Sequence, residues 1–404
     1  MPLPQHRAHR IVLRRTVLQR VVIVRGVTVA GPVRAAAAFL VSRVLLGATV
    51  LAMAAFAGQG AVDHPWATGS WWLDHFSAWD SYHYVRIATL GYLPPGLDCC
   101  DQAYFPGYPL LMAALAPLTG GNVTAAGLLI SLVAGAAAAG LLWLLVARDA
   151  RGGTAAARRA VTLLALAPSG FFFVAVYTEA LFLALALGAW VLATRRHWWL
   201  AGLVAALATG VRVNGLFLAA ALVVLYAVQW HSDGRARPRP DVLALGLPAV
   251  SVAAFVTYLH SRTGSWDAWR EAEHRGWDRA TAWPWEGLAT AWRSLLDSPN
   301  VWLAASRAAD IAAVLFGVAV CVLLARQRRW PELTYLGLTV GIVVCSTLWV
   351  STPRYALTWF PAYLAIATLR DTPAYRRTYA VGLALSAALL LAAAWATATR
   401  HWLA

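Results

Sequence analysis

The sequence contains no lysine and few charged residues of any kind. Of its 404 residues, 13% are charged and 60% are hydrophobic, whereas a typical soluble protein has about 25% charged residues. This shortage of charge excludes an ordinary soluble domain. Apolar runs of roughly 15 to 25 residues recur along the chain, which is typical of a polytopic helical membrane protein. We therefore expect an all-α integral membrane protein with many spans.

The positive charge comes from arginine alone and is not gathered in one polar domain. The formal net charge is +15, and a nucleic-acid-binding protein can be equally basic. Here, however, the arginines lie between the apolar runs, as they do in the cytoplasmic loops of membrane proteins. The pattern therefore predicts membrane lipid as a partner and no nucleic acid.

Cysteine is scarce as well, with four residues in the chain. Cys321 and Cys345 lie in apolar runs, where we expect them to be buried as small hydrophobic side chains. Cys99 and Cys100 are adjacent in a polar segment, and two ligands are too few for a zinc site. A disulfide remains open if this segment is extracytoplasmic, and the sequence does not choose its geometry.

Residues 1–34 lack the short apolar core and the small-residue cleavage site of a signal peptide. They carry a series of arginines instead. We expect a basic tail that stays in the cytoplasm and can rest on anionic lipid. The transmembrane domain is then expected at 35–398, in a multi-pass protein of the plasma membrane.

Arginine placement also decides how the chain crosses the membrane, because cytoplasmic loops are enriched in arginine. The apolar stretch 105–120 is short and contains three prolines. If it crossed, the later arginine-rich loops would face outside. We therefore interpret it as a re-entrant or interfacial helix, and expect about eleven transmembrane helices: 35–56, 123–147, 161–177, 180–194, 198–211, 215–230, 241–260, 309–325, 332–350, 355–369 and 378–398.

Two long outer loops follow from this topology, at 57–122 and 261–308, and they hold most of the acidic residues. Several polar residues that interrupt apolar runs should lie on the same side. Glu179 is at one hairpin tip, Arg212 and Asn214 are at the next, and Arg354 precedes the tenth span.

The two hairpins have arms of only about 14 to 17 residues, which is short for a hydrocarbon core of roughly 30 Å. Their tips should therefore lie below the outer surface of the membrane. Ionisable groups at that depth indicate a water-filled cavity rather than contact with lipid. The sequence thus predicts a polar cavity that opens outward beneath the two outer loops.

The first outer loop contains the stretch SAWDSYHYVRIATLGY, residues 77–92, which is unusually rich in polar and aromatic side chains. If it is helical, Asp80, His83 and Tyr84 share one face. Tryptophans just before it indicate a segment in the headgroup zone. A simple interfacial anchor helix, with Asp80 merely facing water, is the alternative that the residues leave open.

Five blocks in order resemble the GPI mannosyltransferase 2 (PIG-V) family. They are WDSYHYVRIATLGY with AYFPGYPLL, then APSGFFFVAVYTEALFLAL, TGVRVNGLFLA, the tryptophan-rich loop 265–288, and TPRYALTWFPAYLAIA, and they extend over roughly residues 35 to 370. Within that loop the stretch EAEHRGWDR matches only loosely, and neither the basic tail nor Cys99–Cys100 belongs to the pattern.

The resemblance implies a membrane-embedded glycosyltransferase of the GT-C type. Such an enzyme is expected to move a hexose, here mannose, from a polyprenyl-phosphate sugar donor to a glycan or glycolipid acceptor on the extracytoplasmic face. This transfer needs a base for the acceptor hydroxyl and positive groups for the leaving phosphate. Asp80 is the candidate catalytic base. Its ordinary pKa is about 3.9, and we expect a low-dielectric cavity to raise it.

The candidate substrate-binding residues are His83, Tyr84, Glu179, Arg212, Asn214 and Arg354. Arg212 and Arg354 are suited to binding phosphate oxygens and stabilising charge on the leaving group. Simpler alternatives stay open, because Glu179 could pair with Arg212 only to neutralise a buried charge. Arg354 could equally be an ordinary arginine at the end of a span, and His83 a hydrogen-bonding neighbour.

Other polar and aromatic residues also have two interpretations. Arg43, inside the first span, is expected to reach the cytoplasmic side or pair with a neighbouring helix. The second outer loop has a tryptophan series that suits an interfacial belt, or alternatively sugar stacking or prenyl binding: Trp266, Trp269, Trp277, Trp283 and Trp285. We predict no metal ligands, and without a second nearby acid of obvious DxD type beside Asp80 a divalent cation is optional.

Two other classes of function compete with an enzyme. A secondary transporter or lipid flippase would also combine many spans with buried charges, but its two halves should match in hydropathy, and no such repeat is evident. A non-enzymatic subunit that supports another transferase is the third interpretation. The polar loop around Asp80 favours the enzyme over both.

Overall fold

The computed structural model describes residues 29–60, 64, 66–96, 99–234 and 239–401. The expected basic tail 1–34 therefore lies almost entirely outside the described residues. Over the described ranges the chain is helical, and its only β-type pairing is an isolated bridge between Thr281 and Ser346. The all-α polytopic fold class is confirmed.

The α-helices follow one another as α2 Ala30–Phe56, α3 Trp71–Asp74, α4 Asp80–Leu90, α5 Gly107–Leu115, α6 Val123–Ala147, α7 Thr154–Ala165, α8 Glu179–Thr194, α9 Trp198–Val211, α10 Gly215–Ser232, α11 Leu247–Thr263, α12 Ala268–Trp277, α13 Pro284–Leu296, α14 Val301–Arg326, α15 Trp330–Val344, α16 Thr352–Ala356, α17 Phe360–Ala367 and α18 Pro373–Ala398. Short 3₁₀ helices stand between them at η1 Asp101–Ala103, η2 Ala116–Thr119, η3 Gly170–Val174 and η4 Pro240–Gly246.

Six segments of the described chain are long and apolar enough to cross a membrane: α2, α6, α10, η4 with α11, α14 and α18. Helices α8, α9 and α15 are apolar but shorter. Two expected spans are not continuous helices, because α7 ends at Ala165 and α17 is only Phe360–Ala367. The expected eleven crossings therefore stay a prediction, with at least two of them broken.

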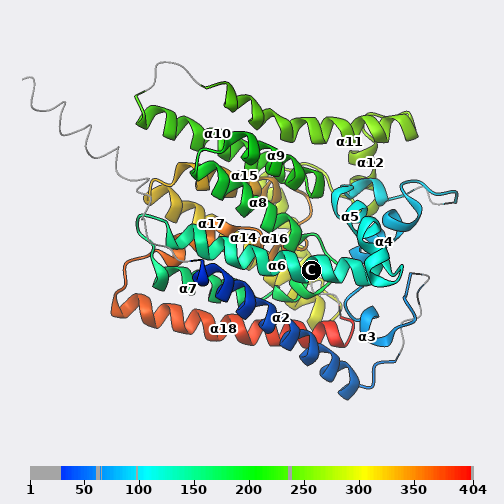
Figure 1. Ribbon diagram of the computed structural model, residues 1–404. Coiled ribbons are helices and arrows are strands. Elements are labelled where there is room, and N and C mark those ends of the chain that lie inside the picture. The colour runs from blue at the N-terminus through cyan, green and yellow to red at the C-terminus, as the bar shows by residue number, and fades with distance from the viewer. Residues whose placement is uncertain (1–28, 61–63, 65, 97–98, 235–238, 402–404) are drawn as a thin grey trace, which may run out of the picture.

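The helix bundle has two chemically different ends. In Figure 1, α3, α4, α5 and α12 gather at the right-hand end, while the α7 and α17 labels lie toward the left. Ion pairs join the arginine-rich loops to one another: Arg329 with Asp149, Arg159 with Asp371, and Arg196 with Asp233. These pairs bring loop 148–160 together with 326–329 and 370–377, and loop 195–197 together with 231–240. The side of the membrane that they face stays a prediction. Helix α5 packs on α4 and α6, in keeping with a segment that does not cross.

We expect cysteine labelling to show which end faces the cytoplasm. In a background without Cys321 and Cys345, Ala155→Cys in α7 should react with a membrane-impermeant maleimide only from the cytoplasmic side. Asp297→Cys, at the end of α13, should react only from outside. Both positions are exposed in the structure. Labelling of both from the same side would contradict the two-ended arrangement.

Arg43 in α2 is buried in the bundle rather than extended to a membrane surface, with 2% of it exposed. Its guanidinium donates hydrogen bonds to the carbonyls of Gly170, at 2.7 Å, and Ala165. The last carbonyls of a helix lack partners within that helix, and α7 ends at Ala165. Of its two expected roles, pairing with a neighbouring segment is therefore the correct one, and Arg43 stabilises the break after α7.

Replacing Arg43 with methionine should destabilise the fold. The change keeps a long apolar side chain but leaves two buried carbonyls without donors, at a cost of about 1–3 kcal/mol for each unsatisfied group. Thermal unfolding in detergent would measure the loss. Arg34→Met is the matched control, because Arg34 is an exposed arginine of the same helix. Equal unfolding temperatures for the two variants would contradict the role of Arg43.

Candidate active site

Asp80 is the first residue of α4, and the chain makes a sharp turn to place it there. The preceding residue, Trp79, has a φ of 55°, which is unfavourable for a side chain other than glycine. Hydrogen bonds on both sides hold this turn. The hydroxyl of Tyr177 donates to the Ala78 carbonyl at 3.0 Å, and that of Ser81 donates to the Val176 carbonyl at 3.0 Å.

Asp80 belongs to a chain of ion pairs that joins four distant parts of the sequence. Its Oδ2 accepts a hydrogen bond from Nη1 of Arg354 at 2.5 Å. The Nε of the same arginine lies 3.5 Å from Oε1 of Glu179. That Glu179 oxygen also accepts a hydrogen bond from Nη1 of Arg212 at 2.6 Å. The structure thus brings together the residues that the sequence analysis selected around Asp80.

The segment that carries Arg354 is held in place by a hydrogen bond to α14. Ser351 has a φ of 62° and precedes the short helix α16. The backbone N–H of Thr352 donates to Oδ1 of Asp310 at 2.8 Å, and Asp310 is buried in α14. The Arg354 guanidinium lies 5.2 Å from the ring centre of Tyr177, a distance typical of a cation–π contact. These contacts fix the direction in which Arg354 points.

The pKa of Asp80 is lowered, contrary to the expectation from the sequence. Burial raises it, but the charge of Arg354 and the hydrogen bond from that residue outweigh burial, so the pKa falls below its ordinary value. Oδ1 also accepts a hydrogen bond from the Tyr104 hydroxyl at 3.1 Å. The expectation failed because it considered the low-dielectric cavity and not the partner that the fold supplies.

A cavity of about 840 Å³ opens beside this network. Five predicted site residues line it: Asp80, Tyr84, Arg212, Asn214 and Arg354. Glu179 does not line the cavity, because its side chain is wholly buried behind the two arginines. Of the two interpretations offered for Glu179, the structure therefore favours a buried counter-charge over contact with substrate.

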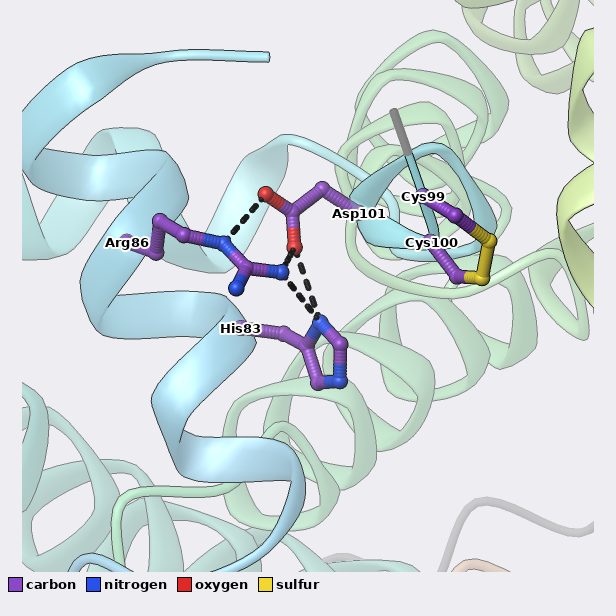
Figure 2. The surroundings of a disulfide bond; sticks show 5 residues. All are labelled: His83, Arg86, Cys99, Cys100 and Asp101. Atoms are coloured by element: carbon purple, nitrogen blue, oxygen red, sulfur yellow. Dashed lines mark hydrogen bonds and ion pairs between the residues drawn. A yellow bond between two sulfur atoms is a disulfide. The ribbon is translucent and has the colours of Figure 1, made fainter. Parts of the chain in front are cut away.

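His83 stacks on Tyr104 of the cavity wall, and Figure 2 shows that Asp101 holds its ring. Its Nδ1 is 2.8 Å from Oδ1 of Asp101, and Nε of Arg86 donates to Oδ2 of Asp101 at 2.7 Å. Burial raises the pKa of Asp101, but the bonds from His83 and Arg86 outweigh it and the pKa is lowered. Among the alternatives for His83, a hydrogen-bonding neighbour fits this geometry better than a ligand for substrate.

Asp101 directly follows a disulfide between Cys99 and Cys100, which is drawn in Figure 2. The Asp101 carboxylate thus ties the disulfide-bearing segment to α4 through His83 and Arg86. This segment is part of the first outer loop, where a disulfide is compatible with an oxidising compartment. The disulfide that the sequence left open therefore joins Cys99 to its neighbour Cys100.

Among the other polar residues that line the cavity, Glu273, Arg279 and Tyr355 were not predicted from the sequence as site residues. Nη1 of Arg279 lies 3.3 Å from Oε2 of Glu273, and its Nη2 is 3.5 Å from the Tyr355 hydroxyl. Tyr355 follows Arg354 in a recognised block, which was a usable signal. Glu273 and Arg279 lie in the loosely matching stretch, and no signal in the sequence singled them out.

A bound divalent cation was an optional expectation, and we tested it against the donor groups. In the part of the chain that the structure describes, no three His, Cys, Asp or Glu side chains are grouped to hold a metal ion. Four carboxylates line the cavity: Asp80, Asp267 and Glu273 are each paired with an arginine, and Glu271 accepts a hydrogen bond from Ser265. The described residues therefore present no grouped metal ligands, and the optional divalent cation stays a prediction.

Comparisons with known proteins find similarity over part of this chain. Residues 44–236 match the family model described as mannosyltransferase (PIG-V). The chain is 36% identical over 152 residues to GPI alpha-1,6-mannosyltransferase 2 of Cricetulus griseus, a match that covers 36% of this chain and 30% of that protein. The protein of the same name from Homo sapiens is 34% identical over 156 residues, with the same coverage of both chains. The chain thus matches less than a third of the length of these relatives. Over residues 44–236, which include Asp80 and Arg212, the chain is thus similar to the mannosyltransferase (PIG-V) family.

Proposed function

We propose that this protein is a membrane mannosyltransferase that uses a polyprenyl-phosphate sugar donor. It transfers the hexose, expected to be mannose, to a glycan or glycolipid acceptor on the extracytoplasmic face. The observation that carries this proposal is the contact of Asp80 with Arg354, at 2.5 Å, in the wall of an open cavity. The family match supplies the type of chemistry, and the cavity supplies an acid–base group beside a cation.

In this mechanism Asp80 takes the proton of the acceptor hydroxyl. As the acceptor oxygen bonds to the anomeric carbon, the bond from that carbon to the phosphate oxygen breaks, and the phosphate leaves with the electron pair. A carboxylate with a lowered pKa is a weak base toward the acceptor hydroxyl before the attack begins. The hydroxyl becomes more acidic as the attack proceeds, however, so a late proton transfer suits Asp80.

Arg354 links donor binding to this base. A donor phosphate competes with Asp80 for the same guanidinium, and a guanidinium that moves to phosphate stabilises charge as it builds on the leaving group. Asp80 then loses its counter-charge, and its pKa rises toward its ordinary value. Arg212 stays in place, because Thr178 at 2.7 Å and Glu179 at 2.6 Å both accept from its Nη1. It therefore supplies a fixed positive charge to the cavity.

The cavity also has an apolar part that suits a prenyl chain. Phe217 of α10 and Ile342 and Val343 of α15 line it together with the charged residues. Ile342 is 52% exposed at the surface of the bundle, so the apolar lining continues to the membrane-facing side. A lipid-linked donor could therefore place its phosphate near Arg354 while its chain stays in contact with lipid.

The position of the charged residues favours an enzyme over a transporter. They gather at one end of the bundle, whereas a transporter binds its substrate near the midplane of the membrane.

Transfer from defined donors tests the proposal. The full chain, purified into lipid nanodiscs, would be given radiolabelled polyprenyl-phosphate mannose or, separately, a radiolabelled nucleotide-linked mannose. We expect label to be released to water or transferred to added octyl hexosides from the prenyl donor only. Use of the nucleotide sugar, or no breakage of either donor, would contradict the proposed function.

A further inference from the structure

The tryptophan series of the second outer loop divides into two groups in the structure. Trp266, Trp283 and Trp285 are 62%, 64% and 64% exposed and do not line the cavity. Their exposure suits an interfacial belt, one of the two roles that the sequence left open. Trp269 and Trp277, both on α12, line the cavity instead. The belt interpretation therefore does not account for these two residues.

Trp269 has a structural role, which leaves Trp277 as the aromatic surface available to a ligand. The indole N–H of Trp269 donates to the Ala103 carbonyl at 3.2 Å, and its ring packs edge-on against Phe105. Trp277 is half-buried, with its ring centre 5.7 Å from that of Tyr104 in an edge-on arrangement. Tyr104 in turn donates to Asp80. Tyr104 therefore contacts both Trp277 and Asp80, the candidate base.

Glu273 lies one helical turn before Trp277, on the same face of α12. Its carboxylate is paired with Arg279 at 3.3 Å, and 22% of its side chain is exposed. Burial raises the pKa of Glu273, Arg279 lowers it, and the charge of Asp80 raises it further, with an elevated pKa as the result. Glu273 and Asp80 are two carboxylates that line the same cavity.

An aromatic ring beside a carboxylate–guanidinium pair is better suited to bind a sugar than to bind the phosphate or the prenyl chain of the donor lipid. The C–H face of a hexose ring is apolar, while its rim carries hydroxyls that donate to a carboxylate and accept from a guanidinium. A phosphate would be repelled by Glu273. A prenyl chain would give no hydrogen bond to the buried Nε of Arg279, which has no partner within the described residues, and an unsatisfied buried polar atom is unfavourable.

We infer that Trp277, Glu273 and Arg279 form the binding subsite for the acceptor sugar, with the ring stacked on Trp277 and its hydroxyls bound by the ion pair. This inference rests on the proposed function, because it places the acceptor opposite the donor phosphate at Arg354. The attacking hydroxyl then points toward Asp80. The second outer loop supplies the acceptor side of the site, and the first outer loop supplies the base.

The test separates transfer to a sugar from transfer to water. Purified protein would be given radiolabelled polyprenyl-phosphate mannose, with octyl mannoside and octyl glucoside as the acceptor probes. Glu273→Gln and Trp277→Ala should each raise the KM for the octyl hexoside about tenfold, the effect of one charge-assisted hydrogen bond or one aromatic contact. The ratio of transfer to sugar over release to water should therefore fall in both variants, because only the sugar reaction uses the subsite.

Trp283→Ala and Trp285→Ala are the matched controls and should change neither reaction. An equal loss of both reactions in Glu273→Gln and Trp277→Ala would overturn the inference, as would an unchanged KM for the hexosides. Equilibrium binding of radiolabelled octyl hexosides in the absence of donor gives a second readout. Binding that Trp277→Ala abolishes would support the subsite even if wild type fails to cleave the donor, which would contradict only the proposed function. Absence of binding by wild type would overturn the subsite.

Discussion

Asparagine in place of Asp80 should lower mannosyl transfer by roughly 10²- to 10⁴-fold, the range that general base catalysis contributes. Asparagine keeps the size of the side chain and can still accept from the Tyr104 hydroxyl, but it cannot take up a proton. Donor binding should not weaken and can tighten, because Arg354 no longer divides its interaction between Asp80 and the phosphate. Steady-state kinetics with labelled donor would therefore show a fall in kcat without a rise in the KM for donor.

Asp267→Asn is the matched control, because Asp267 is a carboxylate in the cavity wall that is 67% exposed. It should leave kcat unchanged. Near-normal transfer by Asp80→Asn would remove Asp80 from the mechanism. The interpretation of α4 as a simple interfacial anchor would then account for the residues better.

Methionine in place of Arg354 should affect both stability and activity. It removes the cation shared by Asp80 and Glu179, and the loss of one partner from a buried ion pair typically costs about 3–5 kcal/mol. Thermal unfolding should therefore shift to lower temperature. The KM for donor should rise while kcat falls, because Arg354 is proposed to bind the donor phosphate and to stabilise its charge during transfer.

The double variant Asp80→Asn with Arg354→Met separates the two effects. Removal of both charges should restore part of the lost stability, since Asp80 is no longer left unpaired, but it should not restore transfer. Arg293→Met, at an exposed arginine of α13, should change neither property. An Arg354→Met variant with normal donor KM would show that the phosphate binds elsewhere.

Several candidate residues selected from the sequence lie close together in the structure, but the sequence did not indicate which of them pair. Apolar runs and arginine placement were enough to predict the helical membrane fold. Hairpin tips with Glu179 and Arg212 indicated buried charge. The sequence could not show that Arg354 contacts Asp80 across 274 positions of separation, because that contact depends on how α16 is anchored to α14.

The same limit explains the errors. The pKa of Asp80 was expected to rise because burial alone was considered, whereas the structure supplies Arg354 as a partner that lowers it. Two apolar runs were interpreted as continuous spans, although α7 ends at Ala165 and Arg43 binds the carbonyl there. Glu273 and Arg279 were missed, since charged residues in an outer loop carry no local sign that they face a cavity.

The most direct test of the central claim is the structure of this chain with a polyprenyl-phosphate bound. We predict that the phosphate lies against the Arg354 guanidinium, that the contact between Asp80 and Arg354 has opened, and that the prenyl chain passes Phe217 and Ile342. A phosphate bound at the opposite, arginine-rich end of the bundle, with Asp80 still paired to Arg354, would contradict the account.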